Sequence, residues 1–141
     1  MSAFIERKDY DATVHAEIID SLTRKDDTIV EICEDRAIDQ MKSYMEARYN
    51  VDVIFSMSGG DRIPLVLMMC LDIAVYHIYT AGNPQKLSQI RKDRYDRAIE
   101  WLKGVQKGLI TISGAPLRED DVRNSASEYQ MKSNPKRHNH F

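Results

Sequence analysis

"IPLVLMMCLDIAVYHIY", residues 63–79, is the most apolar stretch of this chain, and it contains one aspartate, Asp72, near its middle. A helix that spans a membrane needs about 20 consecutive, mostly apolar residues. Residues 63–79 fall short of that length, and both Asp72 and His77 lie within them. We therefore predict a buried core helix and no association with a membrane.

The residues around this stretch predict where the helix begins and ends. Pro64 is tolerated in a first helical turn because its missing N–H has no intrahelical partner there, and Asp61 is a plausible N-cap. Gly82 is typical of a helix C-terminus, and Pro84 prevents the helix from continuing. A helix over residues 63–82 that is apolar nearly all round should be surrounded by the other elements.

Helical periodicity recurs in three further segments. Residues 13–22 carry apolar side chains four positions apart, which predicts a short helix. A long helix is predicted over 28–49, with Asp26 or Asp27 as its N-cap, and another over 85–107. The predicted fold is therefore all-α, with three long helices and a short N-terminal helix.

The remaining segments lack helical periodicity. "LITIS", residues 109–113, alternates apolar and polar residues as a short strand does. Residues 50–62 form a long connection that contains "VDVIF", which favours a short strand or an extended segment. We expect residues 1–12 to be an N-terminal arm, 13–113 the helical domain, and 114–141, which hold few large apolar side chains, a flexible or partner-ordered tail.

Composition limits the class of protein. The 141 residues suffice for one domain with a real core, and 43% hydrophobic and 30% charged residues are ordinary for a protein that folds in water. A formal net charge of -2 gives no general reason to bind nucleic acid. Cys33 and Cys70 lie in apolar helical patterns, which indicates buried, reduced thiols. The N-terminus has no basic start followed by an apolar run, so we expect no signal peptide.

The sequence offers little catalytic chemistry. The four histidines are not arranged in any metal-binding motif: His15 and His77 lie in predicted helices, and His138 and His140 lie in the tail. "SGG" at 58–60 lacks the lysine that follows in a phosphate-binding loop. We therefore predict no catalytic, cofactor-binding or metal-binding residue, no cofactor and no enzymatic activity.

Asp72 needs a partner if it is buried, because an isolated charge in a dry core is very costly. The predicted last helix supplies Arg91 and Arg94, which come level with Asp72 if that helix folds back, and Arg48 is a third candidate. A structural ion pair is favoured over a catalytic role for this carboxylate.

Three phrases, in this order, resemble the Mu-type family of phage neck proteins, which are related in shape to the head–tail connectors, or adaptors, of tailed phages and prophages. They are "AIDQMKSYMEARY" at 37–49, "PLVLMMCLDIAVYHIY" at 64–79 and "RYDRAIEWLKGVQKGLITI" at 94–112. The resemblance covers roughly residues 10–113. The connection at 50–62 is longer than the family's usual one and lacks its proline. The positions that match the motif, mainly structural, are Tyr44, Arg48, Tyr49, Asp72, Tyr76, Tyr79, Tyr95, Ala98, Leu102 and Gly108.

The resemblance implies a structural protein of the virion neck, made in the cytoplasm of the bacterial host. Such subunits form a ring, commonly twelvefold, below the portal protein; the ring extends the DNA channel, through which DNA passes without sequence-specific binding, and docks the next neck or tail component. We expect partner contacts at the long connection and in the basic end of the tail. The candidate residues are Phe55, Met57, Arg62, Lys132, Lys136 and Arg137.

Two other functions fit the same residues. One is a cellular helical adaptor or regulator that acts through protein–protein contacts. The other is a small ligand-binding protein or enzyme built around Asp72 and His77, which would need a cavity beside Asp72.

Overall fold

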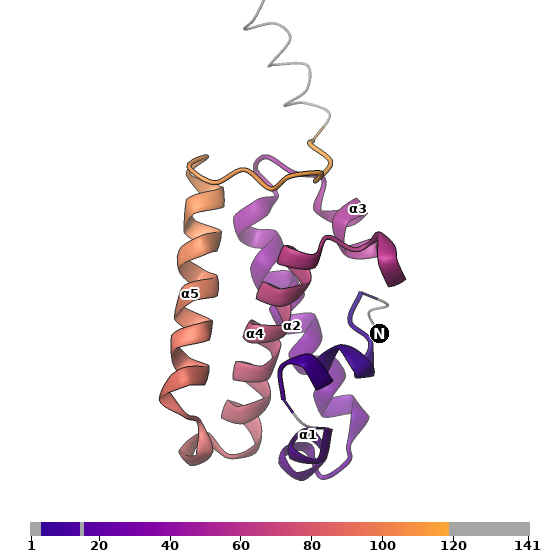
Figure 1. The fold of residues 1–141 in the computed structure, drawn as a ribbon, viewed down its shortest axis with the longest axis vertical. Helices are drawn as coiled ribbons and strands as arrows, with labels where there is room; N and C mark the ends of the chain where they lie inside the picture. The colour runs from indigo at the N-terminus through magenta and orange to yellow at the C-terminus, as the bar shows by residue number, and fades with distance from the viewer. Residues whose placement is uncertain (1–3, 15, 119–141) are drawn as a thin grey trace, which may run out of the picture.

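The apolar stretch forms helix α4 (Pro64–Gly82), which runs through the middle of the protein (Figure 1). The computed structural model describes residues 4–14 and 16–118. Within them the secondary structure is helical, and the only extended pairing is one isolated antiparallel bridge between Tyr49 and Leu117. The predicted all-α class is confirmed for this part of the chain.

Two long helices flank α4. Helix α2 (Asp27–Met45) begins as predicted, because the Asp26 side chain accepts a hydrogen bond from the backbone N–H of Thr28. Helix α5 (Gln89–Gln106) begins later than predicted, at an N-cap formed by Ser88, because a 3₁₀ turn, η3 (Pro84–Lys86), comes first. Figure 1 shows α5 running antiparallel to α4 at its side.

The start of α4 also differs from the prediction. Its N-cap is Ile63, which offers no side-chain cap, and Asp61 lies in a separate 3₁₀ turn, η2 (Gly59–Asp61). At the other end, a Cβ on Gly82 would lie 2.5 Å from the carbonyl oxygen of Leu22 in helix α1 (Ala16–Thr23). Only glycine therefore allows α1 and α4 to approach this closely.

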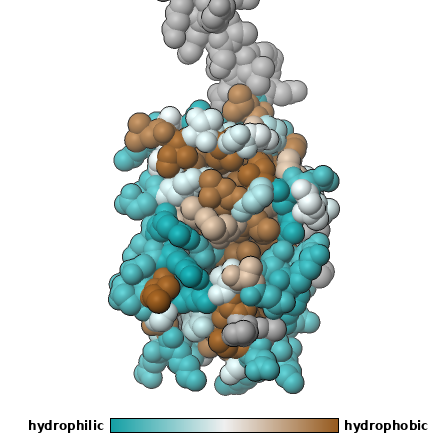
Figure 2. Space-filling view, viewed as in Figure 1, coloured by the Kyte–Doolittle hydropathy of each residue, from teal (hydrophilic) through white to brown (hydrophobic). Residues whose placement is uncertain are grey.

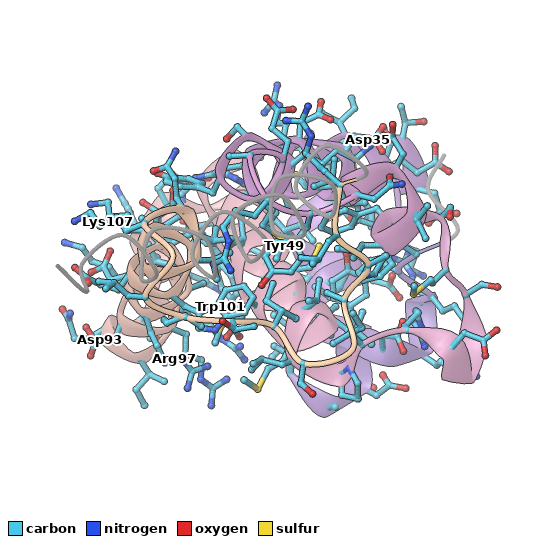
Figure 3. All side chains as sticks on the ribbon, turned by 90° about the horizontal axis from the view of Figure 1, so that it is seen from above. Asp35, Tyr49, Asp93, Arg97, Trp101 and Lys107 are labelled. Carbon is cyan, nitrogen blue, oxygen red and sulfur yellow. The ribbon has the colours of Figure 1, made fainter. Side chains whose placement is uncertain are left out.

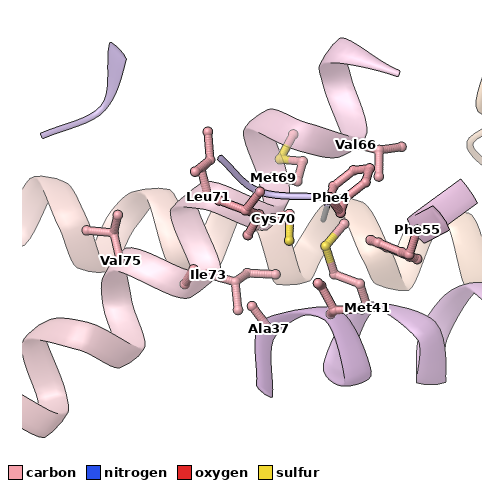
Figure 4. Close-up of a cluster of buried hydrophobic side chains, with 14 of the residues drawn as sticks. Phe4, Ala37, Met41, Phe55, Val66, Met69, Cys70, Leu71, Ile73 and Val75 are labelled. Carbon is pink, nitrogen blue, oxygen red and sulfur yellow. The ribbon is translucent and has the colours of Figure 1, made fainter. Parts of the chain in front are cut away.

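Residues 4–12, part of the predicted N-terminal arm, pack on the core. Residues 7–12 form the 3₁₀ helix η1 (Arg7–Ala12), and Phe4 and Tyr10 are fully buried. Figure 4 shows Phe4 between α4 and α2, close to Met41 and Phe55. The sequence prediction missed this packing because a segment of a dozen mixed residues has no periodicity, so its two buried aromatic residues could not be recognised as core.

The connection 50–62 contains a helix where a strand or extended segment was expected. Helix α3 (Val51–Ser56) begins at Asn50, whose side chain accepts a hydrogen bond from the N–H of Val53. Val51, Ile54 and Phe55 are buried, and their spacing of three and four places them on one face of the helix. The cap and the packing outweigh the β propensity of "VDVIF".

The predicted strand at 109–113 is also absent. Helix α5 ends in a Schellman motif: Gly108, at φ +78°, donates to the carbonyl of Val105, and the N–H of Leu109 donates to that of Gly104. Residues 107–118, called here the apex segment, then cross the end of the bundle towards α3 (Figure 1). The alternation of "LITIS" reflects one buried residue, Ile112, and not a strand.

The core lies between α4 and its neighbours. Helix α4 has buried residues along its whole length, and α1, α2, α5 and η3 all pack on it. By length and composition α4 would meet the criteria for a membrane span, but 56% of its most apolar window is buried inside the protein, which is the pattern of a core helix. The predicted central position of this helix is therefore confirmed.

Candidate functional site

Asp72 lies at the seam between α4 and α5 and is paired with an arginine that the sequence analysis did not name. Arg97 Nη2 donates to Asp72 Oδ2 at 2.7 Å; the carboxylate side chain is 5% exposed and the guanidinium side chain 53% exposed. The two partners expected from the last helix, Arg91 and Arg94, do not pair with Asp72. Arg91 donates to the backbone carbonyl of Thr13, and Arg94 forms no salt bridge with any described residue.

The identity of the partner follows from where α5 begins. Helix α5 begins at residue 89 and not 85, so the residue that faces Asp72 lies further along α5 than expected. Burial raises the pKa of Asp72, while the hydrogen bond and charge of Arg97, and the charges of Arg94 and Arg91, act in the opposite direction. Asp72 does pair with an arginine of the last helix, as predicted, but the arginine is Arg97 and not Arg91 or Arg94.

A second polar contact joins α2, α4 and α5. Tyr76 and Tyr95 stack with ring centroids 3.9 Å apart, and the Gln40 amide donates to the Tyr95 hydroxyl at 3.0 Å. His77 Nε2 lies 3.0 Å from Gln40 Oε1, so the imidazole donates to that oxygen. Burial and the charge of Arg36 lower the pKa of His77, which favours the neutral ring. These groups hold three helices in register.

The apex of the bundle gathers several of the family-motif residues. Arg48 Nη1 donates to the carbonyl of Ile110 at 3.5 Å and its guanidinium lies 5.5 Å from the Tyr49 ring centroid. The hydroxyl of Tyr49, a buried residue, accepts from the N–H of Ile112 at 2.9 Å. Asn50 and Arg118 complete the contact through backbone hydrogen bonds to Pro116 and Arg48. Arg48 therefore fixes the apex segment and does not pair with Asp72.

Two residues expected at partner contacts are internal. Arg62 forms a salt bridge with Asp9 in which both side chains are at most 10% exposed, and it also donates to the carbonyls of Phe4 and Gly59. Phe55 is buried and meets the Phe4 ring edge-on at 4.9 Å. Neither is available to another molecule. Met57 is partly exposed, whereas Lys132, Lys136 and Arg137 lie outside the described residues.

A buried acid lies between the N-terminal segment and α2. The Tyr10 hydroxyl donates to Glu34 Oε2 at 2.6 Å, and both residues are buried. Burial raises the pKa of Glu34, and the neighbouring carboxylates Asp35 and Glu31 raise it further, although Tyr10 acts against them. No sequence motif marks this pair; only the three-dimensional packing brings the two residues together.

The other predicted residues lie within the fold. Cys33 and Cys70 are buried and unpaired, and burial raises the pKa of both thiols. Tyr79, Ala98 and Leu102 are buried, and Tyr44 packs partly against the core. Among residues 4–14 and 16–118, no group of three or more histidine, cysteine, aspartate or glutamate side chains could hold a metal ion. His15, His138 and His140 lie outside the described residues.

A family model for the protein described as Bacteriophage Mu, Gp36 matches residues 4–132. The chain belongs to this family. The match confirms the predicted resemblance to a Mu-type phage protein, and it extends through the N-terminal segment, the connection 50–62 and the apex segment. Searches of the curated proteins and of the solved structures returned no significant match.

The exposed surface of this Gp36-family protein carries apolar side chains near one end of α4. Leu65 and Met68, one turn apart, are 41% and 42% exposed. Figure 2 shows apolar side chains gathered over the N-terminal half of α4 between more polar flanks. Two open depressions on the surface are lined by residues of α1 and its following loop, with Tyr79 and Lys86, and neither includes Asp72 or His77.

Proposed function

We propose that the chain is a head–tail connector, or adaptor, subunit of a phage or prophage. Copies of it form a ring, twelvefold if it matches the portal symmetry usual for such connectors, at the virion neck. The ring lies below the portal protein, extends the DNA channel and docks the next neck or tail component. The subunit is made in the cytoplasm of the bacterial host and has no catalytic role.

The observation that carries this proposal is the match to the Mu Gp36 family over residues 4–132, nearly the whole chain. The packing supports it. The side chains that could perform chemistry, such as Asp72, His77 and Cys70, are engaged in contacts between helices or buried. What the protein offers to its surroundings is surface, including the apolar pair Leu65 and Met68, of the kind that protein partners cover.

Charge is consistent with a channel through which DNA slides. A protein that neutralises many phosphates gains affinity for nucleic acid from released counterions. The chain has 20 lysine and arginine residues against 22 aspartate and glutamate residues, so it has no net positive charge to drive such binding. DNA would pass the ring without being held. A cellular adaptor, the other interaction protein considered, is less favoured because the matching family is that of a phage.

The proposal is tested by assembly and by position in the virion. Negative-stain microscopy of concentrated protein, alone and with the portal protein of the same phage, should show rings. A phage that lacks the gene should accumulate filled heads without tails, and antibody labelling should mark the neck of wild-type particles. Tailed, infectious particles from the deletion strain would contradict the connector role. Metabolic genes beside this gene, in place of portal, capsid and tail genes, would also contradict that role.

A further inference from the structure

The outer face of α2 carries a row of carboxylates. Glu31, Asp35 and Asp39 recur every four residues and so form one ridge along the helix, called here the acidic ridge. None of them forms a salt bridge within residues 4–14 and 16–118, whereas Asp27, at the start of the same row, is paired with Arg7. Like charges at this spacing disfavour a helix, so the ridge is a cost to the isolated subunit.

The ridge also has an apolar component. Ile32, next to Glu31 and on the outer side of α2, is 44% exposed. Arg36 is exposed on the same helix and is the single cation among these positions, leaving a net negative surface. The ridge therefore combines an apolar contact point with an excess of carboxylates, which favours a partner that has an apolar residue beside free ammonium groups.

Such a partner surface exists on the same protein, at the C-terminal end of α5. Lys103 and Lys107, four residues apart, are both exposed and form no salt bridge with any described residue. Leu109 follows them and is 80% exposed, the highest value among the exposed large apolar residues of the described chain. These three residues are called here the lysine end.

We propose that the acidic ridge of one copy binds the lysine end of the next copy. This contact rests on the proposed ring and names the surfaces that build it. The two surfaces carry opposite charges, and each supplies one exposed apolar residue. Figure 3 shows Asp35 and Lys107 on different sides of the bundle, so one copy cannot pair them within itself. A contact between two different surfaces repeats from copy to copy and, when its rotation closes, produces a ring.

Charge swaps test this contact with a built-in rescue. Variant A, D35K/D39K, has lysines on both surfaces, and variant B, K103E/K107E, has carboxylates on both. Each alone should associate at least about tenfold more weakly than wild type, because like charges face each other at the contact. An equimolar mixture of A and B should assemble again, with copies alternating. Mass photometry across a salt series measures all of these species.

A control and a cross-linking readout keep the outcomes distinct. K92E/D93K exchanges charges on α5 away from the lysine end and should assemble like wild type; circular dichroism checks that every variant is folded. Carbodiimide coupling of mixed light and heavy-isotope wild-type protein should join Lys107 to Asp35 or Asp39 between copies.

The possible failures separate the contact from the function. If wild type assembles and variants A and B assemble equally well alone, this contact is wrong and the ring stands. If wild type remains monomeric at low salt and high concentration and yields no intercopy cross-link, both the self-contact and the proposed ring are wrong.

Discussion

Removing Arg97 tests whether the ion pair at the α4–α5 seam stabilises the fold. The variant Arg97→Met keeps much of the aliphatic packing but leaves the Asp72 carboxylate, 5% exposed, without its 2.7 Å donor. A hydrogen bond to a charged group contributes about 1.5–3 kcal/mol. Because Arg97 is half exposed, water offsets part of that loss, and we expect about 1.5–2 kcal/mol. For a protein of this size the Tm should fall by roughly 5–8 °C.

The loss should depend on pH, and the sign follows from the pKa of Asp72. Burial raises that pKa in the folded protein despite Arg97, and it rises further when Arg97 is removed. Between the unfolded and folded pKa values the folded state binds more protons, so stability decreases as the pH rises through this window. The difference between Arg97→Met and wild type should therefore be full at neutral pH and shrink as acid protonates the carboxylate.

Urea unfolding at several pH values measures these quantities, with a double-mutant cycle to isolate the pair. In an Asp72→Asn background, Arg97→Met should cost less than about 0.5 kcal/mol, because no buried charge is left unpaired. Lys92→Met, an exposed change on the same helix, is the control. A loss at neutral pH below about 0.5 kcal/mol, or one that is the same at every pH, would refute the reasoning.

Three further changes probe other contacts. Arg62→Met should cost about 3–5 kcal/mol in urea unfolding, because it leaves Asp9 buried without its cation. Burial raises the pKa of Asp9, but the hydrogen bonds from Arg62 and from the Glu6 N–H lower it by more, so the stabilisation should be full above about pH 4 and lost in stronger acid. Gly82→Ala should cost about 1–3 kcal/mol in thermal unfolding because its Cβ meets the Leu22 carbonyl, and no loss would contradict that approach. Tyr49→Phe should cost about 1–3 kcal/mol and speed hydrogen exchange in the apex segment alone; unchanged exchange there would remove this role.

The long helices could be predicted because their signals are local. The Pro64 start, the Asp26 cap and the apolar stretch 63–79 each specify helix geometry within a few residues of themselves. Helix α3 could not be predicted the same way, since its six residues are rich in β-branched side chains and are held by tertiary packing on one face. The alternation in 109–113 fits both a strand and an irregular segment that buries Ile112, and the sequence alone does not distinguish them.

The contacts of the candidate site were harder to predict than the helices. Burial of Asp72 implied a cation, and the antiparallel return of the last helix implied which helix supplies it. The residue itself, Arg97, depends on where α5 starts, and a shift of a few residues in that boundary moves the partner by one turn. The pairs of Arg62 with Asp9 and of Tyr10 with Glu34 join segments far apart in sequence and have no signal before the fold is known.

The contacts of the apex segment also bear on how the protein folds while it is being synthesised. Arg48 and Tyr49 are bonded to residues 62 and 63 positions later in the chain. Loops of that length close late, because chain entropy must be overcome before the contact forms. A growing chain can pair α2 with α4 while the partners of Arg48 and Tyr49 are still unmade. The apex would then be completed only after α5 has docked, so that a segment translated after α5 secures Arg48 and Tyr49, which were translated much earlier.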